Sequence, residues 1–482
     1  MYHEHPLRIL RYSVKNIWLL IFPLLRGVSV LHFKAEDWYI WLKGAWFDIL
    51  ILCLIILFGF IRWNFSTISI DEGELVYRAG IILRIYTSIP VSSISVVTAE
   101  RKFYLVPFSG VNLSFDTRAG IFKTTDMTIL VTEKISDEIM KSIPCAKMKK
   151  STEEVHKAGA FSVLLFSVFF SSGFSGVVYI AAFFFKGGDI AHDIISVSLS
   201  RITETTEKFT EKIEFIQKIP TAAVAVGIVF LSAWLLSFIV NILRYSRFHI
   251  DSDGEYFHVV CGILNRRNYN IKSEHINYSD LRQNLIMKIF GAVTVNISCA
   301  GYGAGSQYLP VLLPIKLEKN LGKSLEQLGI FGGVKNEFRP KLSSVWNYTW
   351  QPVIFGLSLI PAYRISVHFL PALKNLIFFL VIMLAIPSVW LTVIRITALC
   401  TSGISIYDDK IILRCSKWTS FHTVVAERKN IVKFEIKQTV FQKYTNKNCR
   451  VSVWLCGETK ARYTVRALKM SDVQNIAKLT DF

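Results

Sequence analysis

Hydrophobic residues are concentrated in six long runs along the chain, and the segments between these runs are more polar. A helix that crosses a bilayer needs about 20 mostly apolar residues, because each helical residue advances the chain by about 1.5 Å. Proline within such a helix is tolerated when neighbouring helices satisfy the freed carbonyl groups. The sequence therefore predicts six transmembrane helices arranged as three hairpins. The runs are 17–31, 46–61, 158–185, 222–243, 345–365 and 376–394.

The three long segments that follow the hairpins alternate apolar and polar residues and open alike. FSTISIDEGELVY starts at Phe65, FHIDSDGEYFHVV at Phe248 and SGISIYDDKIILR at Ser402. Alternation interrupted by a short Asp/Gly stretch is typical of a strand, a tight turn and a second strand. Several short strands followed by one helix predict a small barrel or sandwich. The predicted order is hairpins at 1–62, 158–243 and 344–395, followed by domains at 63–157, 244–343 and 396–482 respectively.

Landmark residues keep their spacing between the first two of these segments. Gly80 lies 14 residues before Ile94, and Gly262 lies 14 residues before Ile276. The stretches VNLSFDTRAG and AVTVNISCAG then align position for position, whereas the third segment lacks the first glycine and is the diverged copy. Constant spacing of this kind indicates an internal repeat of one structural unit. Helical patterns close the three copies at 136–143, 317–328 and 470–479.

The repeated unit resembles a known domain. The strand–turn–strand opening, the G-I-[IL] step, the I-P-x-x-x-I pattern at Ile89, Pro90 and Ile94 and the closing A-G are similar to the bacterial pleckstrin-homology (PH) domain of YdbS/YdbT-like membrane proteins. The resemblance implies a partly open, seven-stranded barrel with a C-terminal helix, each domain preceded by a transmembrane hairpin. It does not imply phosphoinositide binding, because the first turn is acidic, with Asp71 and Glu72 in the first copy, and repels phosphate.

Charge predicts the orientation of the chain in the membrane. The formal net charge is +19, and the three large segments hold 42 Lys+Arg against 26 Asp+Glu, whereas connector 187–219 holds 4 against 6. In a membrane protein such an excess marks the cytoplasmic segments rather than a nucleic-acid surface. No small-residue cleavage site follows the first apolar run, so we expect a retained helix. The sequence therefore predicts a multi-pass cell-membrane protein with a cytoplasmic N-terminus and cytoplasmic domains, and without a nucleic-acid partner.

Motifs for catalysis are absent from the sequence. It contains no H-E-x-x-H, no Walker A loop, no G-x-S-x-G and, among its eight cysteines, no C-x-x-C. The glycine-rich stretch 301–306 lacks a following Lys-[Ser/Thr], which favours a hairpin loop over a phosphate cradle. The terminal pair His3 and His5 is expected to be exposed rather than to bind a metal. We therefore expect a non-enzymatic protein with no cofactor and no metal site.

The excess of positive charge is largest in the third domain, which contains 16 Lys+Arg and 7 Asp+Glu. This excess is larger than the topology requires, and it indicates a face that docks on a membrane or on an acidic partner. The candidate residues for this face are Lys433, Lys437, Lys443 and Lys447.

Two functions remain open. The leading hypothesis is a membrane scaffold whose three domains lie against the bilayer and present strand edges to other proteins, in cell-envelope maintenance or in resistance to membrane-active agents. Its expected partners are the lipid bilayer and another membrane protein, such as a smaller PH-like membrane protein of the same family. The alternative is a component of a transport system, which needs polar groups facing the interior of the helix bundle. The candidates for that role are Arg26, Asp48, Asn241, Gln351 and Arg364, a small set.

Overall fold

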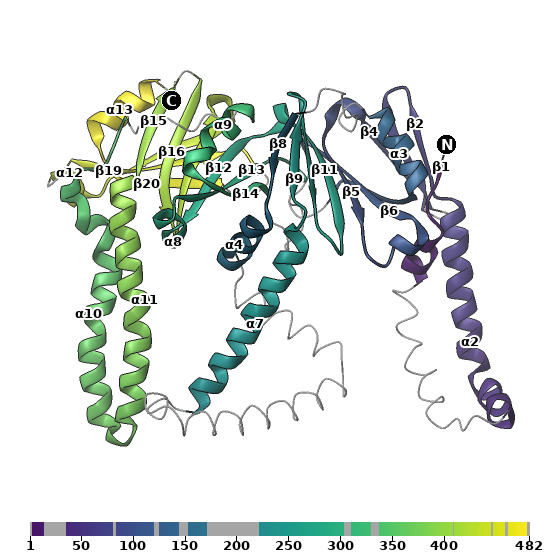
Figure 1. Cartoon of the computed structure of the whole chain (residues 1–482), viewed down its shortest axis with the longest axis horizontal. Coiled ribbons are helices and arrows are strands. Elements are labelled where there is room, and N and C mark those ends of the chain that lie inside the picture. The colour runs from purple at the N-terminus through teal and green to yellow at the C-terminus, as the bar shows by residue number, and fades with distance from the viewer. Residues whose placement is uncertain are drawn as a thin grey trace.

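A computed structural model shows the β-rich segments side by side in a row, with helices α2, α7, α10 and α11 all extending from one side of that row (Figure 1). The structure describes residues 2–13, 35–80, 83–119, 125–143, 153–170, 221–302, 310–328, 337–407, 409–444, 447–457 and 461–479. The predicted first span with Arg26, and the second half of the predicted third span, lie outside the described residues.

Each repeat folds into two three-stranded antiparallel meanders followed by a helix. In the first repeat these elements are β2 (Thr67–Asp71), β3 (Glu74–Ala79), β4 (Ile85–Pro90), β5 (Ile94–Arg101), β6 (Gly110–Thr117), β7 (Met127–Thr132) and α3 (Glu133–Ser142). Between the two meanders lies a core of fully buried side chains, among them Ile68, Leu113 and Ile139. Strands that alternate inward and outward residues bury one face of each sheet in this way.

The second and third repeats have the same order of strands and closing helix, with a short helix added between the first and second strands of the second meander. The second consists of β9 (His249–Ser252), β10 (Tyr256–Cys261), β11 (Arg266–Lys272), β12 (Tyr278–Asn284), α8 (Leu285–Ile289), β13 (Ala292–Ser298), β14 (Val311–Leu317) and α9 (Glu318–Gln327). The third consists of β15 (Gly403–Tyr407), β16 (Lys410–Lys417), β17 (Ser420–Glu427), β18 (Ile431–Lys437), α12 (Val440–Tyr444), β19 (Asn448–Leu455), β20 (Ala461–Lys469) and α13 (Met470–Leu479). The three closing helices lie where the sequence predicts them.

Glycine is required at two turns of this unit. The first turn of the first repeat places Glu72 at φ 49° and Gly73 at φ 81°, the left-handed conformation that a tight hairpin needs. Gly262 follows β10 at φ 95°, and a Cβ there would lie only 2.2 Å from the backbone oxygen of Asn265. The G-I-[IL] step therefore marks a turn that a side chain cannot enter.

A short segment that precedes each predicted membrane hairpin pairs with the first strand of the domain that follows it. β1 (Tyr2–His3) pairs with β2, and β8 (Glu153–Lys157) pairs with β9. In the third repeat the same contact is an isolated bridge between Phe338 and Ile404. In the first two repeats, the seventh strand expected for the fold therefore comes from the chain before the hairpin.

Neighbouring domains share continuous sheets. β5 of the first domain pairs with β11 of the second, and β12 of the second pairs with β17 of the third. The resulting orders are β7-β6-β5-β11-β10-β9-β8 and β14-β13-β12-β17-β16-β15. The three domains are thus joined edge to edge rather than tethered by linkers.

Two helices in the described part are long and apolar enough to cross a membrane, at Leu342–Phe369 and Ile377–Thr401. Only 11% of the 18-residue apolar stretch of each helix is buried inside the protein. They correspond to α10 (Val345–Phe369) and α11 (Lys374–Thr401), which pack as a hairpin despite three internal prolines. A core helix of a soluble domain would be mostly buried, so this exposure indicates a lipid-facing pair.

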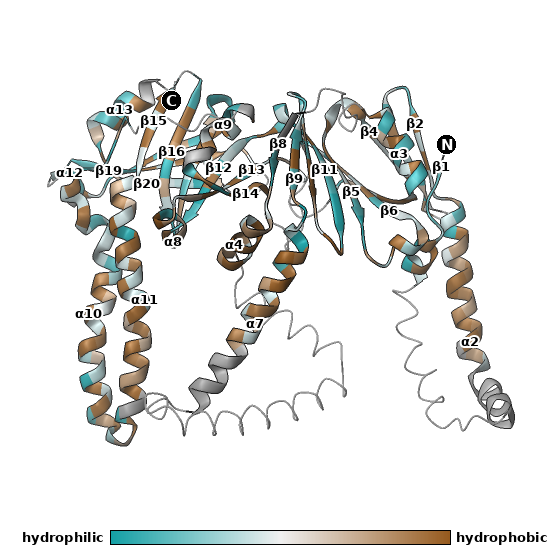
Figure 2. Ribbon diagram, viewed as in Figure 1, coloured by the Kyte–Doolittle hydropathy of each residue, from teal (hydrophilic) through white to brown (hydrophobic). Residues whose placement is uncertain are grey.

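The other predicted spans are represented less completely. The described residues contain shorter apolar helices at Ile49–Asn64, Ala160–Phe170 and Phe230–Tyr245. They belong to α2 (Ala35–Asn64), α4 (Ala160–Phe170) and α7 (Thr221–Tyr245). Figure 2 shows that α10, α11 and the described lengths of α2 and α7 are predominantly hydrophobic, in contrast to the mixed surface of the sheets. In the described part of the chain, two of the six predicted spans are thus present as helices long and apolar enough to cross a membrane.

Candidate functional site

The two domain junctions use the same strand register. In each copy an isoleucine, Ile94 or Ile276, follows the short 3-10 turn between the two meanders. Two residues further on, Val96 lies opposite Ile271 at the first junction and Tyr278 lies opposite Ala426 at the second. Both opposing residues lie two places before the 3-10 turn of the next domain. One mode of domain pairing therefore occurs twice.

An ion pair crosses the first junction. Arg267 Nε donates to Glu100 Oε1 at 2.8 Å, and the side chains of Arg267 and Glu100 are 13% and 11% exposed. Arg267 also donates to the hydroxyl of Tyr269 at 3.1 Å. Burial raises the pKa of Tyr269, so this phenol stays neutral. The carboxylate of one domain is thereby fixed to the guanidinium of the next.

The second junction has a polar contact in nearly the same place. His422 Nδ1 lies 2.9 Å from Asp280 Oδ2, and both side chains are almost fully buried. Arg282, which pairs with His422 in the ladder, lies 3.4 Å from the same carboxylate. Arg282 and His422 occupy the register positions of Glu100 and Arg267 at the first junction. Because buried charges are costly when unpaired, these contacts select a matched partner strand.

In the third domain, the strand equivalent to β5 and β12 lies at the edge of a sheet. This strand is β18, and its sheet has the order β18-β19-β20 among the described residues. The strand equivalent to β11 and β17 in the first domain, β4, is likewise an edge of its sheet. Among the described residues, the row therefore ends in two edge strands of the type that pairs at the internal junctions.

The four predicted lysines lie on and around β18. Lys433 and Lys437 project from β18 on the same face, and each contacts Glu435, at 3.7 Å and 3.3 Å. Lys443 is in α12, and Lys447 directly precedes β19 at φ 49°. Lysine on an edge strand commonly prevents unwanted sheet pairing, and Glu435 partly neutralises the face. The structure brings Lys433 and Lys437 together, whereas Lys443 and Lys447 flank the strand end.

The apolar side of β18 is incompletely covered. Ile436 is 37% exposed, whereas the equivalent residues at the two internal junctions, Ala99 and Leu281, are 9% and 7% exposed. Val432 on the same strand is 65% exposed. Pairing with a further strand would bury this surface as the internal junctions do.

Exposed apolar loops lie at the end of each domain from which the helices leave. Gly262 N and Ile263 N donate to the carbonyls of Ser246 and Leu243, so the β10–β11 loop packs on the end of α7. Leu83 and Trp418, which are 76% and 79% exposed, occupy the equivalent loops of the other domains. A second loop in each domain adds Phe103, Tyr104, Val106 and Phe108, then Ile286, Ile289 and Phe290, and finally Val440 and Tyr444. Clusters of exposed apolar side chains beside membrane helices are typical of contact with the bilayer interface.

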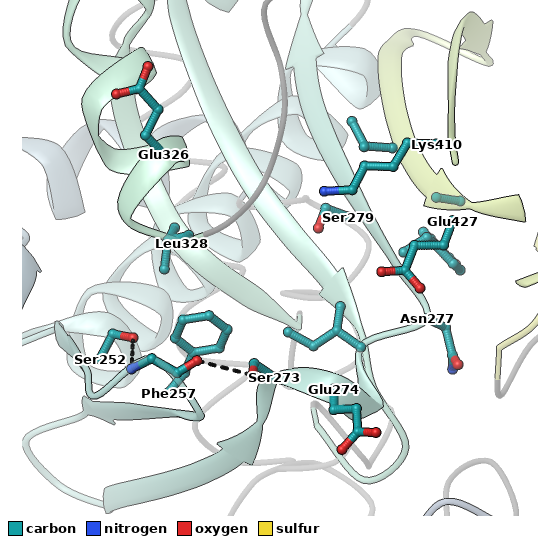
Figure 3. Close-up of a pocket in the computed structure, with 15 residues that line it drawn as sticks. Ser252, Phe257, Ser273, Glu274, Asn277, Ser279, Glu326, Leu328, Lys410 and Glu427 are labelled. Atoms are coloured by element: carbon teal, nitrogen blue, oxygen red, sulfur yellow. Dashed lines mark hydrogen bonds between the residues drawn. The ribbon is translucent and has the colours of Figure 1, made fainter. Parts of the chain in front are cut away.

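A cavity of about 480 Å³ lies between the second and third domains (Figure 3). Lys410 and Glu427 lie on one side of it, and Ser252 and Ser273 make hydrogen bonds within the loop opposite. Charges of both signs, from Glu274, Glu326, Lys410 and Glu427, are scattered over the wall. In the described part of the chain, no group of three or more His, Cys, Asp or Glu could hold a metal ion.

Sequence reasoning missed the domain junctions. A local signal for the first one is the run Ser95, Val96 and Val97 in β5, which contains no charged residue and whose members are all fully buried in the structure. A strand with one solvent-facing side would alternate, so burial on both sides indicates a strand at the centre of a shared sheet. The edge position of β18 has no such signal, because it depends on which strands pair in space.

Comparison with known proteins agrees with this repeated unit. The profile of the Bacterial PH domain matches residues 21–142 and 196–325, more than half of the chain. The chain belongs to the bacterial PH domain family. Both matched regions end in a repeat of the row, the first and the second, and begin before it, at residue 21 within the first apolar run and at residue 196 within the connector 187–219.

The chain is also similar to a curated transmembrane protein. The UPF0699 transmembrane protein YdbT of Bacillus subtilis (strain 168) is 22% identical over 313 residues, which is 62% of this chain and 64% of that protein. The chain thus matches somewhat less than two thirds of the length of this relative. No solved structure matches the chain.

Proposed function

We propose that this protein is a non-enzymatic multi-pass membrane scaffold that holds a row of three PH-like domains against the cytoplasmic face of the cell membrane. The observation that carries this proposal is the repeated edge-to-edge register, because it makes one rigid platform from three domains. The excess of Lys and Arg in the domains supports the cytoplasmic orientation. Membership of a PH-domain family and similarity to a transmembrane protein agree with this role.

Three hairpins with six crossings are part of the proposal. The segment before each hairpin pairs with the strand after it, through β1–β2, β8–β9 and the Phe338–Ile404 bridge. Both ends of each apolar segment therefore lie at the same face of the row, and a chain that returns to the same face crosses the bilayer an even number of times. Two crossings per segment fit the length of the apolar runs.

The platform lies with its apolar loops in the membrane interface. Leu83, Trp418 and the neighbouring aromatic and aliphatic loop residues gain most from leaving water there. Contact with the bilayer at every domain would hold the row parallel to the membrane. The sheet edges at its two ends then remain accessible to other membrane-bound domains.

The expected protein partner is another membrane protein with a PH-like domain, whose third strand pairs with β18. In the repeated register, Lys437 takes the position of Glu100 and Arg282. An acidic residue at the position of Arg267 would pair with Lys437 and complete the cross-junction contact. The β4 strand of a second copy offers Ile85 at that position, so a different chain fits better than a copy of this one. Lys433, Lys443 and Lys447 add positive charge that attracts an acidic domain.

A photo-crosslinking residue placed at Ile436 in the full-length protein in its native membrane tests this pairing. We expect a specific crosslink to a membrane protein at the third strand of its PH-like domain. The same residue at Gln474, an exposed position of α13, is the control and should give no such product. Reversing the charges of Lys433, Lys437, Lys443 and Lys447 should abolish the crosslink. A crosslink that survives this change, or a product without a PH-like domain, would overturn the proposal.

The transport alternative has little support from the described residues. Gln351 and Arg364 are exposed on α10 and do not lie between α10 and α11. Asn241 is only partly buried in α7, and Arg26 and the side chain of Asp48 lie outside the described part. These residues do not gather into a polar pathway in the described helices.

A further inference from the structure

A pocket of about 610 Å³ lies where the end of α11 meets the outer face of the last sheet. Its wall combines residues from the membrane helix, the β16–β17 turn and the strands β19 and β20, and it contains no acidic residue. The residues that matter here are Arg395, Lys417, Trp418, Arg450, Trp454 and Arg466. The four basic residues among them are far apart in the sequence and come together only in the folded protein.

The positive charges crowd one another. Burial and the nearby guanidinium groups of Arg395 and Arg450 lower the pKa of Arg466. Arg395 donates to the hydroxyl of Ser416 at 3.2 Å, which holds its head group at the pocket. Like charges assembled in this way are stabilised when an anion binds between them.

The pocket is rigid because the membrane hairpin is fixed to the third domain. Ile394 and Ala398 of α11 are fully buried in a cluster with Tyr348 of α10 and Ala467 of β20. The hydroxyl of Tyr348 donates to the backbone oxygen of Arg466 at 2.8 Å. A preformed site of this kind loses little entropy when a ligand binds.

The position of the pocket matches the level of lipid head groups. Arg395 lies six residues before the end of α11 at Thr401, or about 9 Å along the helix axis. Trp418 is 79% exposed at the neighbouring turn, and the guanidinium of Arg462 lies 5.4 Å from the ring of Trp454. Tryptophan prefers the boundary between hydrocarbon and water. The basic pocket therefore opens at the level of the phosphates of the leaflet that faces the domains.

We propose that this pocket binds the phosphate group of an anionic glycerophospholipid. Arg450 and Arg466 contact the phosphate oxygens, since guanidinium groups bind phosphate through paired hydrogen bonds. Arg395 contributes charge from the membrane side, and Trp418 packs against the glycerol and upper acyl chains. Arg450 and Trp454 are the ladder partners of Lys437 and Lys433, so the pocket adjoins the β18 edge. Binding of a lipid phosphate between Arg395, Arg450 and Arg466 does not itself require a protein partner.

Thermal unfolding of the purified full-length protein in detergent, titrated with dioctanoyl phosphatidylglycerol, tests the proposal. We expect a saturable rise in melting temperature with this lipid and little rise with dioctanoyl phosphatidylcholine. The Arg450→Gln/Arg466→Gln variant should bind phosphatidylglycerol at least about tenfold more weakly, because it loses two charge-assisted phosphate contacts. The Lys272→Gln/Lys429→Gln variant removes the same net charge from other surface sites and should bind as the parent does.

Three results would overturn the assignment. Equal stabilisation by the two lipids would exclude recognition of the anionic head group. Equal binding by the double arginine variant would place the lipid elsewhere. Glycerol 3-phosphate or inorganic phosphate binding as tightly as the lipid would show that a soluble phosphate ester is the ligand. Should the glutamine variant unfold, the Arg450→Lys/Arg466→Lys variant keeps the charge but loses the paired hydrogen bonds, and it should bind several-fold more weakly than the parent.

Discussion

Replacing Arg267 by methionine tests whether the ion pair at the first junction holds two domains together. Arg267 and Glu100 are 13% and 11% exposed, so the substitution leaves a carboxylate with little access to water. Removing one partner of a buried pair costs about 3–5 kcal/mol. Lys102 Nζ lies 3.9 Å from Glu100 and can compensate in part, so we expect a loss of about 3 kcal/mol.

Hydrogen exchange of the β5 and β11 amides in nanodiscs measures this loss directly, because it reports the local free energy of opening. A loss of about 3 kcal/mol corresponds to exchange roughly 150-fold faster. The double variant Glu100→Leu/Arg267→Met replaces the pair by apolar groups and should exchange within about tenfold of the parent. Lys429→Met breaks a pair whose side chains are 62% and 43% exposed, and it is the control, with an expected effect below about 1 kcal/mol.

Two outcomes would refute this reasoning. Unchanged exchange in Arg267→Met would show that the junction does not depend on the pair. A double variant as destabilised as the single one would show that lost packing, not an uncompensated charge, explains the effect.

Three further predictions concern single side chains. Gly262→Ala should lower the free energy of unfolding in a urea titration by at least about 2 kcal/mol, because the new Cβ would clash with the backbone of the β10–β11 turn. Gly73→Ala should cost only about 1 kcal/mol, because a Cβ there has no neighbouring atom within 4 Å. Equal effects of the two substitutions would contradict the backbone clash. Burial raises the pKa of Cys415 to about 12, so the Cys415 thiol should resist iodoacetamide at pH 8 while the exposed Cys456 reacts. The contribution of the buried thiol to stability is complete below the unfolded-state pKa of about 9 and should be lost as the pH rises toward 12. Equal labelling rates of the two cysteines would be evidence against burial. Tyr348→Phe removes the bond to the Arg466 carbonyl and should cost about 1 kcal/mol in thermal unfolding; an unchanged melting temperature would show that the hairpin does not depend on it.

Local sequence patterns predict the repeated unit well. The turn at Gly73 and the closing helix at 317–328 follow from backbone preference and from hydrophobic period, both of which act over a few residues. The pairing of Val96 with Ile271 joins residues 175 positions apart, and such contacts have no local periodicity. The lysines at 433 and 437 are evident as charge, but their edge position depends on how the domains assemble.

The basic pocket shows the same limit more clearly. Arg395 belongs to a membrane helix, whereas Arg450 and Arg466 belong to neighbouring strands of a sheet. In the sequence each resembles an ordinary positive flank of an apolar run. Their convergence follows from the packing of α10 and α11 against β17 and β20 through one buried cluster.

The central claim is that three domains form one row on a single face of the membrane. Single cysteines at Glu72, Glu255 and Lys429, one exposed position per domain in a cysteine-free background, test it with a membrane-impermeant maleimide. We expect all three to react in inverted inner-membrane vesicles and none to react in intact spheroplasts. Labelling of any one of them from the outside while the others react from the inside would contradict the claim.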